Sequence, residues 1–331
     1  MTEKSSPPVP FRKGFIAALG PAIITASVVL GPGSILANSK TGASFGYEMA
    51  WVLIIAVVLM IGMVALSTRL GVLMKGTFGE EIAQRAGRPG AVLVGLTIFL
   101  IAGCFQFSNN LGVLFAIEPF AGKDNTTVKY IAIVAMNALA IGALLYARNL
   151  YKSIEKLMKL LVGLMVLGFV GNLIMARPDL MGILKGLIPS LPEGALDTVV
   201  PRRVIGEDGK SQILDHLTPV VAMIGTTFSI AAAYYQSYLV RQKGWTKADY
   251  KTGITDTLTG IGMLGFISFV IMCTAAAAFH DNPEANLPAN PTAADFAMQL
   301  EPTFGPTAMY LFCMGIFAGA FSSFLVNALV G

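Results

Sequence analysis

The sequence predicts an all-α, multi-pass membrane protein. Hydrophobic residues make up 55% of the 331 residues and charged residues only 13%, and the mean hydropathy is +0.69. Soluble domains carry about 25% charged residues. Several stretches are apolar over about 20 residues, the length that a helix needs to cross a bilayer. We expect eight such spans, near 15–38, 47–72, 92–117, 128–147, 157–176, 217–240, 253–279 and 307–330.

Loop charges predict how the chain is oriented. Lysine and arginine gather in alternate loops, at 4–13, 69–88, 148–159 and 241–251. The loop from 280 to 306 contains acidic residues and neither lysine nor arginine. Because basic loops stay inside, we expect a multi-pass protein of the plasma (inner) membrane with a cytoplasmic N-terminus. The polar, proline-rich residues 1–14 are expected to form a disordered cytoplasmic tail rather than a cleaved signal.

Other residues argue against several functional classes. The three cysteines, Cys104, Cys273 and Cys313, all lie in apolar segments, which fits neither a disulfide framework nor metal-ligand spacing. We find no nucleophile–base pair and no phosphate loop, so we expect neither an enzyme nor a resident cofactor. The basic residues sit in short loops and indicate no nucleic-acid partner. The glycines of span seven favour close packing within the chain, with a dimer face as the alternative, and the oligomeric state stays unknown.

The first span is interrupted at its centre by Gly31-Pro32-Gly33-Ser34. Gly and Pro in succession leave backbone groups without helical partners. In a bilayer such groups are tolerated only where they are buried in protein or beside water. Many transporters build a substrate site at a broken helix of this kind. A simple kink that eases helix packing explains the same residues equally well, because Gly and Pro are common in membrane helices.

Polar residues inside the other spans are neutral. Gln106, Asn109 and Asn110 share one face of span three, where they form either a cavity lining or helix–helix hydrogen bonds. Small and hydroxyl residues at 225–237 allow close packing or local unwinding of span six. Asp256, near the cytoplasmic end of span seven, is expected to be an interfacial or capping carboxylate. No charged residue lies near the centre of a span, although ion-coupled transporters usually carry one there.

Several motifs, in order along the chain, resemble the Nramp family of proton-coupled divalent-metal transporters. Gly20-Pro21-Ala22 followed by Gly31-Pro32-Gly33-Ser34 resembles the Gly-Pro-Gly start and the Asp-Pro-Gly-Asn break of that family. The other matches are Phe45-Gly46-Tyr47 with Trp51, Glu155-Lys156-Leu157-Met158, Pro189-Ser190-Leu191-Pro192, and Gly225-Thr226-Thr227 with 234–240. The resemblance runs from about Phe15 to the end of the sequence.

The resemblance implies a leucine-transporter-like fold with inverted repeats. In this fold two five-helix units have opposite topology, and the broken helices 1 and 6 face each other. Residues 15–176 then form the first unit, 177–216 an extracytoplasmic loop, and 217–331 helices 6 to 8 of the second unit. We expect the second unit to be incomplete in this sequence, so that later helices contribute further residues.

The resemblance also implies where a metal binds, and there the sequence departs from the family. The family uses an Asp and an Asn of the first break, with a Met thioether and an earlier backbone carbonyl of span six. The matching positions are Gly31, Ser34, Ser229 and the carbonyl of Thr226. The family histidine two residues after the Met is replaced by Ala231, and no acidic residue lies in 104–110.

The expected substrate site therefore contains only neutral groups. Its residues are Gly31, Ser34, Thr226, Ser229, Gln106, Asn109 and Asn110. A dehydrated Mn²⁺ needs anionic or soft ligands to replace its water, because removing a charge from water costs several kcal/mol. A hydrated Mg²⁺ suits neutral oxygens better, since this ion gives up its water reluctantly. The magnesium-transporting branch of the family is the matching precedent.

Three functions stay open at this point. The first is a secondary transporter of the Nramp type for a divalent cation, hydrated Mg²⁺ or Mn²⁺, with altered selectivity. The second is a transporter of a neutral or zwitterionic small solute, which an uncharged site between half-helix ends would suit. The third is a receptor or scaffold that keeps the fold without transport. The expected partners are a small cation or solute and the lipid bilayer.

Overall fold

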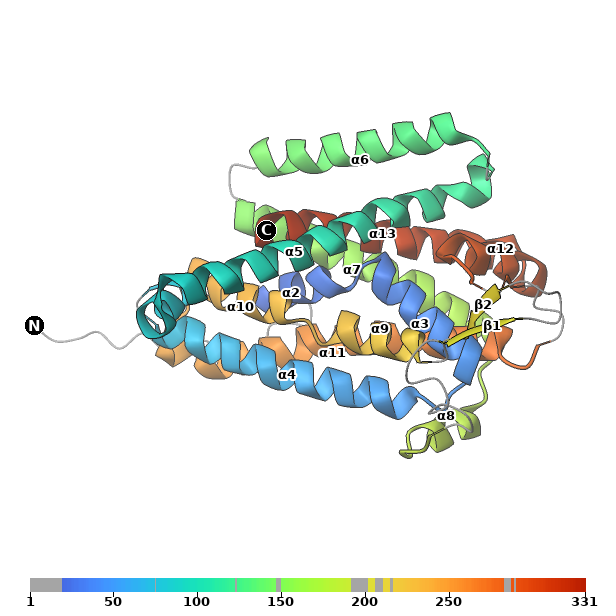
Figure 1. The fold of residues 1–331 in the computed structure, drawn as a ribbon, viewed down its shortest axis with the longest axis horizontal. Coiled ribbons are helices and arrows are strands. Elements are labelled where there is room, and N and C mark those ends of the chain that lie inside the picture. Colours follow the sequence, from blue (N-terminus) through green and yellow to red (C-terminus); the bar gives the residue numbers. More distant parts are fainter. Residues whose placement is uncertain are drawn as a thin grey trace, which may run out of the picture.

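The computed structural model describes residues 20–74, 76–122, 124–146, 150–191, 202–205, 211–214, 217–282, 287–288 and 290–331. The predicted tail, residues 1–14, and the start of the first predicted span lie outside this part of the chain. Long helices run side by side along the long axis of the molecule (Figure 1). Among the described residues, seven helices are long and apolar enough to cross a membrane, and a bent pair adds an eighth span.

The helices follow the predicted apolar stretches closely. The first span is the pair α2 (Pro21–Val29) and α3 (Pro32–Phe45), and the next four are α4 (Ala50–Leu73), α5 (Phe78–Ala121), α6 (Thr126–Tyr146) and α7 (Leu150–Ala176). Span six is the pair α9 (Thr218–Thr227) and α10 (Ile230–Gln242), followed by the short η1 (Lys247–Asp249), α11 (Tyr250–Phe279) and α13 (Pro306–Val330). The prediction of eight spans with two breaks is confirmed.

Helix α3 continues beyond the predicted end of the first span at residue 38. Its polar residues Asn38, Ser39 and Thr41 are buried in the bundle rather than exposed to lipid. Hydropathy alone ends a span at such residues, because it assumes an apolar environment on every side. Burial against neighbouring helices allows α3 to carry them to Phe45.

Helix α5 begins well before the predicted span 92–117, because a helical segment from Phe78 precedes a turn at Gly87. Gly87 lies in the left-handed region (φ 78°) and turns the chain between the two parts. Thr77 begins the helix with a capping box, in which its Oγ1 accepts from Glu80 N and Glu80 Oε2 accepts from Thr77 N. The segment before Gly87 is therefore helical but lies outside the predicted span.

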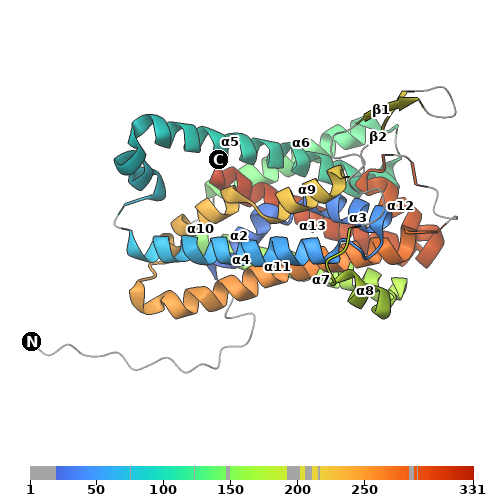
Figure 2. The ribbon, with the colours of Figure 1, turned by 60° about the horizontal axis from the view of Figure 1, so that its bottom comes forward.

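The predicted extracytoplasmic loop 177–216 holds ordered elements. Helix α8 (Leu180–Gly186) lies at the end of the bundle beside the start of α4 (Figure 2). An antiparallel hairpin of β1 (Arg202–Ile205) and β2 (Ser211–Leu214) follows it. The hairpin departs from the all-α prediction, since strands of four residues are too short to give a recognisable alternating pattern.

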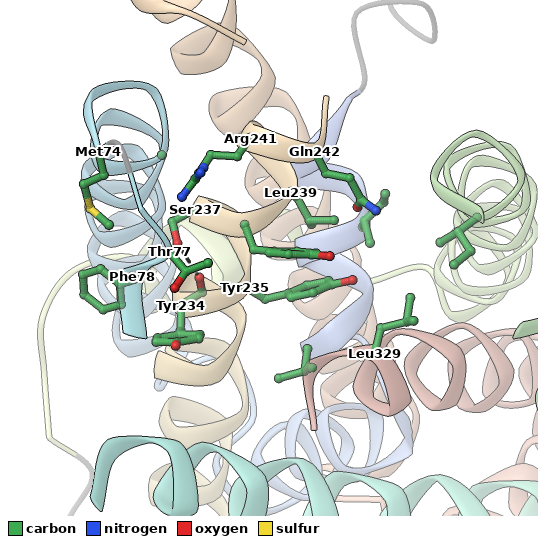
Figure 3. A pocket seen from close by; sticks show the side chains of 15 residues that line it. Met74, Thr77, Phe78, Tyr234, Tyr235, Ser237, Leu239, Arg241, Gln242 and Leu329 are labelled. Carbon is green, nitrogen blue, oxygen red and sulfur yellow. Dashed lines mark hydrogen bonds between the residues drawn. The ribbon is translucent and has the colours of Figure 1, made fainter. Parts of the chain in front are cut away.

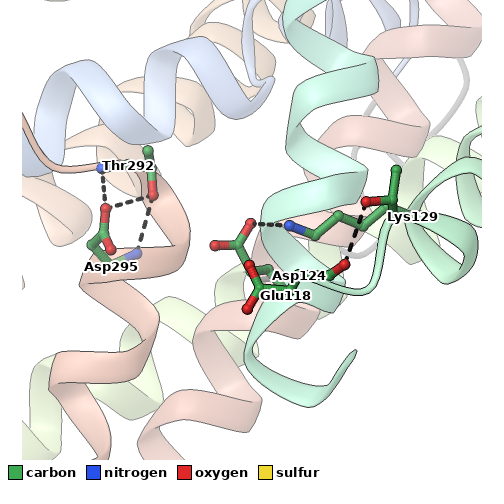
Figure 4. Close-up of polar contacts among 6 residues, drawn as sticks. Glu118, Asp124, Lys129, Thr292 and Asp295 are labelled. Carbon is green, nitrogen blue, oxygen red and sulfur yellow. Dashed lines mark hydrogen bonds and ion pairs between the residues drawn. The ribbon is translucent and has the colours of Figure 1, made fainter. Parts of the chain in front are cut away.

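The second predicted loop, from 280 to 306, contains α12 (Ala293–Phe304). Thr292 and Asp295 form a capping box, with Asp295 Oδ2 accepting from Thr292 N at 2.8 Å (Figure 4). Near this end of the bundle Lys129 Nζ lies 3.0 Å from Glu118 Oε2 and joins α6 to α5.

The broken first span lies at the centre of the bundle. Every residue of α2 is buried. The most apolar windows of α11 and α13 are 72% and 78% buried, whereas those of α5 and α6 are only 11% buried. Helices α11 and α13 therefore form the inner wall around α2 and α3. Helices α5 and α6 expose the apolar surface that faces lipid.

The glycines of α11 pack against neighbouring helices of the same chain. A Cβ built on Gly260 would lie 2.7 Å from the carbonyl carbon of Ala22, and one on Gly265 would lie 2.6 Å from Val57 Cγ1. A Cβ on Gly253 would lie 2.7 Å from a methyl group of α4. The prediction that these glycines serve packing within the chain is confirmed at these three positions.

Candidate functional site

The first span is broken rather than kinked. Helix α2 ends at Val29 and α3 begins at Pro32, and their axes differ by 62°. Between them Leu30 and Gly31 have non-helical backbones, and Gly31 is extended (φ −113°, ψ 179°). Proline suits the first position of α3, because its fixed φ is helical and its missing N–H would have no helical partner there. The local sequence thus ends one helix and begins the next.

The sixth span is broken at the expected position. Phe228 (φ −99°, ψ 82°) and Ser229 (φ −105°, ψ 118°) separate α9 from α10, and Ser229 Oγ accepts from Ala232 N at 3.5 Å. A Cβ built on Gly33 would lie 4.0 Å from Thr226 Cγ2. The two breaks therefore lie next to each other. The Thr226 hydroxyl donates within its own helix, to the Ala222 carbonyl at 2.8 Å.

The space around Gly31 is filled by side chains of two other helices. A Cβ built on Gly31 would lie 2.8 Å from Ser323 Oγ of α13 and 2.9 Å from Asn109 Oδ1 of α5. Asn109 is fully buried, and its Oδ1 has no hydrogen-bond partner among the described residues. The position that carries an acid in the resembled motif therefore has no room for a longer side chain as the chain stands.

Two polar residues of α13 bind the backbone beside the break, and this contact was not predicted from the sequence. The carbonyl of Val28, at the end of α2, accepts from Ser323 Oγ at 3.0 Å and from Asn327 Nδ2 at 2.9 Å. Carbonyls in the last turn of a helix lack helical partners, so α13 satisfies one of them. The only available signal was the i, i+4 spacing of Ser323 and Asn327 in an apolar span, which fits ordinary helix contacts as well.

The three polar residues that the sequence places on one face of α5 have different contacts in the structure. Gln106 Nε2 donates to the Phe324 carbonyl of α13 at 3.0 Å, and Gln106 Oε1 accepts from Asn109 Nδ2 at 3.0 Å. Asn110 Oδ1 accepts from Asn137 Nδ2 of α6 at 2.7 Å. Gln106 and Asn110 therefore make helix–helix hydrogen bonds, and Asn109 is the one of the three that reaches Gly31.

Ser34 begins a polar stripe along α3. It is buried, and its carbonyl and Oγ accept from Asn38 Nδ2 at 2.7 and 3.3 Å. Asn38 and Thr41 follow on the same face of the helix. Asn38 Oδ1 and Thr41 Oγ1 have no partner within the part of the chain that the structure describes. The stripe thus offers hydrogen-bond acceptors from the break toward the end of α3.

The chemistry of the site is that of neutral oxygen acceptors. Among the described residues no three His, Cys, Asp or Glu side chains come together as a metal site. Asn38, Asn109 and Asn327 are buried, and the Oδ1 of each lacks a partner in the described ranges. Such oxygens accept hydrogen bonds from a water shell or from a polar solute. They do not compensate the charge of a bare divalent ion.

A cavity of about 600 Å³ borders α10 between the break and the far end of that helix. Tyr234, Ser237 and Arg241 lie on the side of Phe78, whereas Tyr235 lies on the other side of α10 (Figure 3). The remaining lining residues are Ile24, Gly71, Met74, Thr77, Ile154, Tyr238, Leu239, Gln242, Leu329 and Val330. The cavity therefore lies at the end of the bundle where α2 begins.

The sequence matches one known protein family over most of its length. The profile of the family described as Nramp, natural resistance-associated macrophage protein-like, matches residues 22–331. The chain belongs to the Nramp family. Its curated relatives include the "Divalent metal cation transporter MntH" of Klebsiella pneumoniae subsp. pneumoniae, which is 26% identical over 326 residues. That match covers 97% of this chain and 72% of the relative. The protein of the same name from Chromohalobacter salexigens is 26% identical over 335 residues, with 97% and 70% covered.

Solved structures of a manganese transporter have the same fold. Two mutant forms of the Eremococcus coleocola manganese transporter superpose with a TM-score of 0.72 at 16% sequence identity. Each match covers 97% of this chain and 66% of the other. The chain thus spans about two thirds of the length of these transporters. The leucine-transporter-like fold with broken helices 1 and 6, which the resemblance implied, is confirmed.

Proposed function

We propose that this Nramp protein is a membrane secondary transporter for divalent cations with altered selectivity, carrying hydrated Mg²⁺ or Mn²⁺. The observation that carries the proposal is the pair of adjacent breaks, at Gly31 and at Ser229, in a member of a family that includes divalent metal cation transporters. A broken helix pair of this kind is a usual place for an ion or solute to bind in a transporter.

The lack of charge at the breaks supports the altered selectivity. Gly31 and Ser229 replace the carboxylate and the thioether that the family motif leads one to expect, and Asn109 brings a carboxamide oxygen in their place. A thioether favours soft metals, and Mg²⁺ keeps much of its water when it binds. Neutral oxygens that contact the water shell therefore fit Mg²⁺ at least as well as Mn²⁺.

We further propose that Ser34, Thr226, Ser229 and Asn109 face the cargo, whereas Gln106 and Asn110 position α5. The hydrogen bonds of Gln106 and Asn110 to α13 and α6 support this division. The distribution of basic loops supports an N-terminus in the cytoplasm and a location in the plasma (inner) membrane.

A neutral or zwitterionic solute is the second candidate, favoured by one observation. The buried oxygens near the break belong to carboxamides and hydroxyls, with no carboxylate described among them. Such groups bind donors of a polar solute without a charge that must be balanced.

Uptake into proteoliposomes, with the full-length protein, separates these functions. Saturable flux of Mn²⁺ or Mg²⁺ is the result we expect. Flux of organic solutes that metals do not inhibit would favour the second candidate. Absence of flux for all of them would contradict transport and favour a receptor or scaffold.

A variant that restores the family ligands tests the site itself. Gly31→Asp with Ser229→Met is expected to bind Mn²⁺ measurably when Ser323→Ala makes room beside residue 31. Ser323→Ala alone is the matched control and should bind no more Mn²⁺ than the parent. Equal binding by the two variants would show that the breaks do not form a cation site.

A further inference from the structure

The start of α2 is bound by a carboxylate that the proposed cation site does not use. Asp256 of α11 is fully buried, with its Oδ1 accepting from Gly20 N at 2.5 Å and its Oδ2 accepting from Ala22 N at 2.9 Å. Pro21, between them, has no N–H to donate. The first N–H groups of a helix have no helical partners, and a carboxylate near them is favoured by the helix dipole. Asp256 therefore caps α2 from another helix.

Close packing accompanies this cap. Gly260 follows Asp256 by one helical turn on α11, and a Cβ on Gly260 would lie 2.7 Å from the carbonyl carbon of Ala22. A side chain larger than glycine would therefore push α2 away. Asp256 and Gly260 together form one surface of α11, which we name the docking face, and the first turn of α2 rests on it.

Charged groups of two more helices meet at the same place. A Cβ on Gly20 would lie 2.6 Å from Lys243 Nζ, which places this ammonium at the start of α2. Lys243 Nζ also lies 3.7 Å from Glu155 Oε1, which accepts from Lys159 Nζ at 2.9 Å. The buried carboxylate of Asp256 is thus balanced by a nearby cation as well as by the helix end, as a buried charge requires.

Further along α2, Thr25 Oγ1 donates to Gln236 Oε1, and the Val28 carbonyl accepts from two residues of α13. The helix has nine residues, and helices of this length are marginal without tertiary contacts. One end is the break at Leu30 and Gly31, and the cavity of about 600 Å³ borders the helix at Ile24. The docking face of α11 therefore fixes the first turn of α2, beside this cavity.

We propose that Asp256 is a positioning residue that holds the first turn of α2 against α11. Loss of its two hydrogen bonds lets α2 move away from α11 about the break, which exposes buried residues of α2. The proposal concerns the position of a helix and does not depend on which cation or solute the protein carries.

Cysteine accessibility in nanodiscs tests the proposal on the full-length protein. The reporter is Ser27→Cys, a buried position on α2, in a Cys104→Ser background that removes the exposed native thiol. The labelling rate with N-ethylmaleimide is measured in the parent and in Asp256→Asn. We expect the rate to rise by roughly tenfold in Asp256→Asn, because the amide loses the charge and one of the two acceptor oxygens.

The matched control is Asp249→Asn, which removes an exposed capping carboxylate just before the same helix. It should leave the labelling rate unchanged. Gly260→Ala is a second variant that keeps the carboxylate and displaces α2 by contact alone, and it should also raise the rate. Unchanged protection of Ser27→Cys in the folded variants, or an equal rise in Asp249→Asn, would overturn the proposal. Because labelling needs no transport, this result is independent of the uptake assay.

Discussion

Replacement of Gly31 by alanine tests whether other helices close around the first break. The new Cβ would lie 2.8 Å from Ser323 Oγ and 2.9 Å from Asn109 Oδ1, which is closer than ordinary van der Waals contact. The extended backbone at Gly31 is open to any residue, so the effect is steric. Overpacking of a core costs about 1–3 kcal/mol. Displacing Ser323 also breaks its hydrogen bond to Val28 O, worth about 1 kcal/mol, so we expect a loss of about 2–4 kcal/mol.

The assay is unfolding of the purified full-length protein in detergent, with a double-mutant cycle. Gly225→Ala is the matched control beside the other break, because a Cβ there meets no atom within 4 Å. Ser323→Ala removes the nearest oxygen, so the double variant with Gly31→Ala should lose less stability than the sum of the single losses, by about 1 kcal/mol. A Gly31→Ala protein as stable as the parent, or strictly additive losses, would refute the packing described here.

Three further substitutions test contacts around the broken spans. Asn327→Ala removes one of the two donors to Val28 O and should lower the free energy of unfolding by about 1–2 kcal/mol, measured by the same unfolding assay. Gly112→Ala would place a Cβ against the ring of Pro32, so we expect α5 to detach and size-exclusion chromatography to show a broadened peak. Gln236→Leu leaves two buried threonine hydroxyls without their amide partner and should destabilise by about 1–3 kcal/mol, whereas an unchanged melting temperature would contradict the hydrogen bonds observed.

Local chemistry made the position of the interruption in the first span predictable, although a kink and a break stayed equally possible from these residues alone. Gly31 and Pro32 cannot continue a helix easily whatever surrounds them, so the sequence alone places the interruption. The same holds for the polar face of span three. Each of these features depends on residues within a few positions of one another.

Features that depend on distant residues were not predictable. Ser323 and Asn327 contact Val28 only because α13 is rotated toward the break, and hydropathy carries no information on that rotation. A capping role for Asp256 was one of two expectations, and its partners at Gly20 lie 236 positions away in the sequence. The hairpin β1–β2 was missed because its strands are short.

At the site, too, some features could be predicted from nearby residues and others depend on distant ones. Replacement of the family ligands at Gly31 and Ser229 could be read from the sequence. The filling of the space beside Gly31 by Asn109 and Ser323 could not, because it depends on how closely three helices approach one another. Restoring one ligand is therefore a packing problem as well as a question of charge.

Competition between Mg²⁺ and Mn²⁺ for uptake by proteoliposomes, with the full-length protein, tests the proposed cation transport most directly. A site of neutral oxygens that contacts hydrated ions should discriminate weakly, so Mg²⁺ should inhibit Mn²⁺ uptake at concentrations within about tenfold of those of Mn²⁺. Mn²⁺ uptake that persists in an excess of about a hundredfold of Mg²⁺ would require a soft or anionic ligand at the site, and would contradict the account.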